Sequence, residues 1–158
     1  MDIGHAIHQL PLAVFLRTNA IAYPLVESLH LVSIALLFGS VAVVDLRILG
    51  LSRNLSLRQL ARHVLPWTVL AFMGAAATGS LLFLAHAADL IGNRVFLGKL
   101  ALISLAGTNA VMFHTGPYVN VAAWDVGLQA PPSARVMAAA SIVLWIGVIF
   151  CGRWIAYK

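Results

Sequence analysis

Charge is the property that this 158-residue sequence has least of. Only 9% of its residues are Asp, Glu, Lys or Arg, whereas about a quarter of the residues in a soluble domain are charged. So few charged side chains leave nothing to coat a water-facing surface, which excludes an ordinary soluble globular protein. The length leaves room for one domain over residues 1–158 and for no separate soluble catalytic unit.

Cysteine and the motifs of common enzymes are also scarce. The single cysteine, Cys151, excludes an intrachain disulfide and a metal site made only of cysteines. The sequence has no P-loop, no H-E-x-x-H and no Ser-His-Asp spacing on a loop, so no motif indicates hydrolytic or phosphate-transfer chemistry. The net charge of +5 comes from basic residues at the ends of apolar runs, which indicates contact with lipid headgroups and no nucleic acid.

Apolar residues make up 61% of the chain, and the mean hydropathy is +0.94. They gather in four runs of roughly 20 residues or more, each long enough to cross a hydrocarbon core of about 30 Å as a helix. The pattern predicts an all-α, integral membrane four-helix bundle in a lipid bilayer. The spans are expected at about residues 21–49, 64–87, 95–116 and 136–155.

A shorter apolar segment, at about residues 5–17, precedes the first span. It is too short to cross a membrane, and no basic segment precedes it as in a signal peptide. We therefore expect an interfacial helix or collar, with Asp2, His5 and His8 in the wet layer. Pro131 and Pro132 mark a stop before the fourth helix.

The basic residues predict an orientation. Four arginines cluster in the first loop and its borders: Arg47, Arg53, Arg58 and Arg62. The positive-inside rule places this loop in the cytoplasm and, with four spans, both termini outside. Five basic residues fall on the other side and weaken the asymmetry: Arg17, Arg94, Lys99, Arg153 and Lys158.

Histidines at the cytoplasmic side form the first candidate site. His63 opens the second span and His114 closes the third, so in antiparallel helices they are expected at one depth. Two such imidazoles are what a heme b held between helices requires. Three arginines at this side are candidates to pair with its propionates: Arg47, Arg62 and Arg135. Interfacial histidines that only pack remain the alternative.

The outer side offers a second set of polar residues. His30 and His86 form a second candidate heme pair, although their expected depths differ by about 7 Å. Glu27 shares a helix face with His30 and is expected to pair with Lys99 or Arg153, either as a structural ion pair or as a pocket for an anion, a quinone headgroup or propionates. His30 near Cys151 is a weaker candidate for copper.

Three stretches carry a resemblance to a known group: YPLVESLHLVSIALLFGSVAVVDLRILGL, NAVMFHTG and GRWIAY. They resemble a family of small bacterial four-helix membrane proteins of unassigned function, which implies the bacterial inner membrane with periplasmic termini. More loosely, Glu27-x-x-His30 and its glycine-bearing continuation are similar to helices of cytochrome b561-type and copper-resistance-D-type proteins. The former likeness implies axial heme ligation by the four membrane histidines: His30, His63, His86 and His114.

Three functions follow from these patterns. The first is a cytochrome b-like protein that moves electrons between quinol and a partner. The second is a permease or sensor for an ion, metal or small solute, for which four short helices would require a homo-oligomer. The third is an accessory membrane subunit without cofactor, in which the polar groups only pack.

Overall fold

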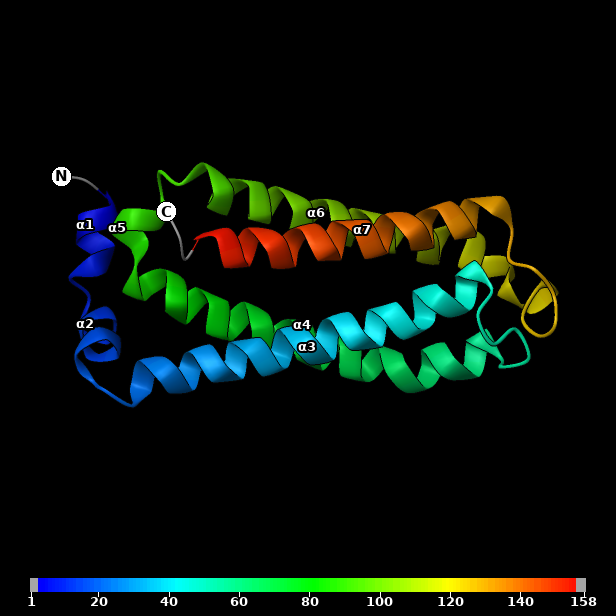
Figure 1. Ribbon diagram of the computed structural model, residues 1–158, viewed down its shortest axis with the longest axis horizontal. Helices are drawn as coiled ribbons and strands as arrows, with labels where there is room; N and C mark the ends of the chain where they lie inside the picture. The colour runs from blue at the N-terminus through cyan, green and yellow to red at the C-terminus, as the bar shows by residue number, and fades with distance from the viewer. Residues whose placement is uncertain (1–2, 156–158) are drawn as a thin grey trace.

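The chain forms an all-α bundle of four long helices (Figure 1), seen in a computed structural model that describes residues 3–155. Each of the four is long and apolar enough to cross a membrane. They are α3 (Ala22–Leu49), α4 (Leu57–Ala85), α6 (Arg94–Thr115) and α7 (Pro132–Ile155). The predicted fold class is therefore confirmed.

Large apolar side chains cover the outside of the bundle. Leu31 on α3, Val111 on α6 and Val143 on α7 are each more than 60% exposed. A water-soluble protein does not expose apolar surface on this scale, because such patches drive aggregation. The outward faces are therefore lipid-facing, and the chain is an integral membrane protein.

The bundle consists of two helical hairpins. α3 packs mainly on α4, α6 packs mainly on α7, and the hairpins meet through α3 and α7. Small residues let α3 and α4 approach closely, as is usual in membranes. A Cβ atom added at Gly74 would lie 2.8 Å from Ser33 Oγ, and one at Gly79 would lie 3.0 Å from His30 Cε1.

Three short helices lie across the end of the bundle that holds both chain termini, which we call the terminal end (Figure 1). They are α1 (Ile3–His8), α2 (Pro11–Thr18) and α5 (Ala87–Leu90). α2 packs on α4, where Arg17 Nη1 donates to Ala85 O at 3.4 Å. The predicted collar is thus two helices rather than one; Asp2 and the side chains of His5 and His8 lie outside the described residues.

The opposite end, with the loops at residues 50–56 and 116–131, is called the arginine end. It includes the 3₁₀ helix η1 (Pro117–Ala123) and a buried cluster at the foot of the helices. The members of this cluster are Ile48, Leu57, Phe113, Val121, Trp124, Ala130, Ala134 and Ala138.

Two helices begin earlier at the arginine end than the sequence indicated. α4 starts at Leu57 rather than about residue 64, because the Ser56 hydroxyl accepts a hydrogen bond from Gln59 N at 3.2 Å and caps it. α7 starts at Pro132 rather than about residue 136, since proline is well tolerated in the first helical turn. The extra turns of α4 carry Arg58 and Arg62, which line the site.

Candidate ligand-binding site

Arg47 holds the loops of the arginine end together. Its side chain is only 3% exposed, and Nε donates to Leu55 O at 2.7 Å. Nη2 donates to Arg53 O at 3.0 Å and also to Asp125 O. The guanidinium predicted to pair with heme propionates therefore serves three backbone carbonyls.

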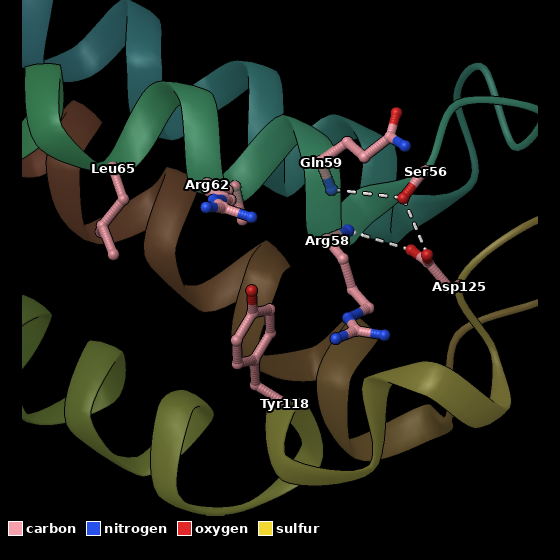
Figure 2. A pocket seen from close by; sticks show the side chains of 8 residues that line it. Ser56, Arg58, Gln59, Arg62, Leu65, Tyr118 and Asp125 are labelled. Carbon is pink, nitrogen blue, oxygen red and sulfur yellow. Dashed lines mark hydrogen bonds between the residues drawn. The ribbon is translucent and has the colours of Figure 1, made fainter.

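Asp125 makes a second connection between the loops. Its Oδ2 accepts from Ser56 Oγ at 2.7 Å, and its Oδ1 accepts from Arg58 N at 2.9 Å (Figure 2). Partial burial raises the pKa of this carboxyl, but the hydrogen bonds from Arg58 and Ser56 outweigh that effect and hold the pKa below its usual range. Asp125 thus fixes the start of α4 against the loop after η1.

A pocket of about 530 Å³, here called the outer pocket, opens between the start of α4 and η1. Figure 2 shows Arg58 and Arg62 from α4 and the Tyr118 ring from η1 around it. Both arginines are exposed, so their charge stays hydrated until a ligand arrives. The full lining is Ser56, Arg58, Gln59, Ala61, Arg62, Leu65, Tyr118 and Asp125.

A second space of about 130 Å³, the inner cavity, lies between the four long helices. It shares Ala61, Leu65 and Tyr118 with the outer pocket, so the two spaces adjoin each other at these side chains. Its wall is mainly apolar, with a few polar side chains from every long helix. These polar residues are Ser40, Asp45, Thr68, Asn109, His114, Tyr118 and Ser141.

Three polar side chains of this wall hold helices together. Thr68 Oγ1 donates to Ser40 Oγ at 2.9 Å, linking α4 to α3, and Asn109 Nδ2 donates to Met137 O at 3.0 Å, linking α6 to α7. Asp45 differs: it is 7% exposed and hydrogen bonds with Ser141, but its Oδ2 is buried without a partner among the described residues.

His114 lies in the wall of the inner cavity. Its Nδ1 lies 2.8 Å from Ala110 O, and because a carbonyl only accepts, Nδ1 carries the hydrogen. In the neutral ring Nε2 is then an acceptor. The ring packs on Phe113 and lies 5.2 Å from the Tyr118 ring.

His63 lies on the other side of α4. The α4 residues that line the cavity, Ala61 and Leu65, each lie two positions from His63, which is about 160° around the helix axis. His63 is exposed and lines neither space. The described structure therefore does not bring His63 and His114 into one cavity, and a heme between them stays a prediction.

The other two membrane histidines are used in packing at the terminal half. His30 Nδ1 lies 2.9 Å from Thr78 Oγ1, whose hydroxyl donates to Gly74 O, so the imidazole is the donor. His86 caps the end of α4 and packs edge-to-face on Tyr23 with centroids 5.3 Å apart. Within residues 3–155 no hydrogen bond or ring contact joins His30 to His86, and the second heme pair also stays a prediction.

Of the remaining outer residues, Lys99 lies close enough to His30 for an electrostatic interaction. Glu27 is exposed beside Tyr23, whereas Lys99 is half-buried on α6 against Gly152 and Cys151 of α7. Arg153 is exposed near the end of α7. Within the described part of the chain no group of three or more His, Cys, Asp or Glu side chains is placed to hold a metal ion.

Four apolar helices around a small, partly polar cavity define a compact class of integral membrane protein. Within that class, the chain belongs to the family DUF6644, described as a family of unknown function, whose model matches residues 4–158. No curated protein and no solved structure matches the chain.

Sequence reasoning found some of these residues and missed others. Arg62 and His114 were predicted, and they line the outer pocket and the inner cavity respectively. Arg58, Tyr118 and Asp45 were not predicted as site residues. Asp45 carried a usable signal, because an acidic residue near the end of an apolar helix is costly unless it has a partner or a function.

Proposed function

We propose that this protein binds a small amphipathic molecule at the arginine end, as a membrane-embedded solute sensor or permease does. One observation carries the proposal: the outer pocket, with its two arginines, adjoins the apolar inner cavity at Ala61, Leu65 and Tyr118. Pockets of mainly apolar lining with a few convergent polar groups are the usual binding sites for small molecules.

The two spaces specify different parts of the ligand. An apolar cavity of about 150 Å³ holds a benzene molecule, so the inner cavity of about 130 Å³ fits one small ring. Arg58 and Arg62 offer cationic hydrogen-bond donors to an anionic or acceptor group in the outer pocket. The ligand is thus a ring that carries an acidic or carbonyl substituent; the quinone class, expected from the sequence, is one variety.

Binding of benzoate to the detergent-purified full chain tests this proposal, with benzyl alcohol as a ring of similar size without the charge. We expect benzoate to bind more tightly, and the double variant Arg58→Gln/Arg62→Gln to lose at least about tenfold in affinity, since a hydrogen bond to a charged group contributes roughly 1.5–3 kcal/mol. Arg94→Gln, an exposed arginine at the start of α6, is the matched control. Equal binding of benzoate by both variants would refute a role for the outer pocket.

Heme-based electron transfer is a narrower hypothesis for the same end of the bundle. His114 supports it, because its Nδ1–H is held by a backbone carbonyl, as in metal-ligating histidines, which leaves Nε2 for a ligand bond. Among the residues that line the inner cavity, His114 is the one histidine, so a second imidazole ligand would have to come from elsewhere. Absorbance spectra of oxidised and dithionite-reduced protein test it: a Soret band that disappears in His114→Ala supports heme, and a folded, colourless protein refutes it.

A further inference from the structure

The wall of the inner cavity contains one strong acceptor that the protein does not satisfy. Asn109 donates to Met137 O and Thr68 to Ser40, whereas Asp45 Oδ2 is buried with no partner within residues 3–155. Buried polar atoms are paired in the great majority of cases, and one left unpaired requires an explanation. Between apolar membrane helices the cost is higher still, because the surroundings offer few other hydrogen-bonding groups.

The neighbouring cations do not satisfy this carboxyl group. Arg47, two positions further along α3, points about 160° away around the helix and donates to loop carbonyls. Arg58 and Arg62 line the outer pocket and not the inner cavity. The titratable side chains that share the cavity wall with Asp45 are His114 and Tyr118, and Ser141 on α7 donates its hydroxyl to the carboxyl group.

We infer that the ring in the inner cavity carries a hydroxyl group, and that the Asp45 carboxyl group accepts its hydrogen bond. The inference rests on the proposed function, because it names what the buried end of that ligand must offer. A hydroxyl group fits better than an ammonium group, whose charge is far more costly to place in a mainly apolar cavity. The ligand class is then a hydroxylated ring with an acidic or carbonyl substituent directed toward Arg58 and Arg62.

Three probes of one shape series test the inference: benzoate, para-methylbenzoate and para-hydroxybenzoate, each bound to the full chain in detergent. The methyl and hydroxyl compounds are similar in size, and only the latter donates a hydrogen bond. We expect para-hydroxybenzoate to bind at least about tenfold more tightly than para-methylbenzoate, the range of one hydrogen bond to a charged acceptor. In Asp45→Asn this preference should fall to about threefold or less, because the amide group keeps only one acceptor oxygen and places an N–H donor beside it.

Glu27→Gln is the matched control, since it removes an exposed carboxylate from the same helix and leaves the cavity intact. Ser141→Ala gives a second variant that keeps the carboxyl group but removes its hydroxyl partner, and it should widen the preference for para-hydroxybenzoate. Equal affinity of the wild-type protein for the methyl and hydroxyl compounds overturns the inference. If benzoate still binds in that case, the proposed function is upheld. A preference that survives in Asp45→Asn overturns the role of Asp45, and binding of none of the three overturns both proposals.

Discussion

At the terminal half of the bundle α3 and α4 close on each other through glycine, whereas at the arginine end the four helices leave the inner cavity between them. Both regions contain histidine, hydroxyl groups and basic residues. At the terminal half, His30 is bonded to Thr78 and its ring lies over Gly79. At the arginine end, Asp45 and His114 face a space that the protein does not fill. The comparison shows that a polar residue in a membrane helix indicates a binding site only where its neighbours leave room.

The largest expected effect concerns the closure of the arginine end by Arg47. Arg47→Leu leaves the carbonyl groups of Arg53, Leu55 and Asp125 without their buried donor, so we expect a loss of about 3 kcal/mol or more in the free energy of unfolding. Denaturant unfolding in detergent measures it. Arg53→Leu, at an exposed position of the same loop, should change stability by less than about 0.5 kcal/mol; equal losses in both variants would contradict a special role for Arg47.

A smaller effect is expected where α3 and α4 close on each other. In Gly79→Ala the new methyl group would lie 3.0 Å from His30 Cε1, which forces the ring or the helices to move and should destabilise the bundle by about 1–3 kcal/mol. Thermal unfolding in detergent measures the loss. Gly107→Ala is the control, because nothing lies within 4 Å of its added Cβ. Equal stability of Gly79→Ala and Gly107→Ala would show that α3 and α4 are not tightly packed at Gly79. The contrast between the terminal half and the arginine end would then fail.

The smallest effect concerns pH at the arginine end. Because the pKa of Asp125 is lowered on folding, its carboxylate stabilises the folded state above the unfolded value of about 4, and this contribution disappears as pH falls through the folded pKa. Asp125→Ala should therefore cost about 1 kcal/mol at pH 7, a modest figure because the group is partly exposed. The gap between wild type and variant should narrow below about pH 4 in thermal unfolding. A gap that is constant with pH would show that the carboxylate charge contributes nothing.

The sequence predicted the four spans because an apolar run of twenty or more residues is long enough to cross a bilayer and has few other stable structures besides a membrane-spanning helix. It placed the start of α4 seven residues late, since hydropathy locates the edge of the lipid and not the end of the helix. Arg58 and Arg62 were interpreted as loop residues, but they lie on the helical turns between Leu57 and residue 64.

The site was less predictable than the fold. Depth follows from helical rise, so His63 and His114 were reasonably expected at one level. Rotation about the helix axis does not follow from rise, and it places Ala61 and Leu65 in the wall of the cavity and His63 on the opposite side. The role of Tyr118 depends on η1, a short helix after a glycine that no apolar periodicity marks.

The bond from Arg47 to the Asp125 carbonyl joins parts of the chain 78 residues apart. Helices of a membrane protein insert before they dock. Arg47 therefore enters the membrane with α3 and α4 before Asp125, in the loop at residues 116–131, has been synthesised. Until then the carbonyl groups of Arg53 and Leu55, in the loop directly after α3, are the acceptors that the structure pairs with its guanidinium. Docking of α6 and α7 then adds the Asp125 carbonyl as the third acceptor, so this bond forms at the step that also completes the walls of the cavity.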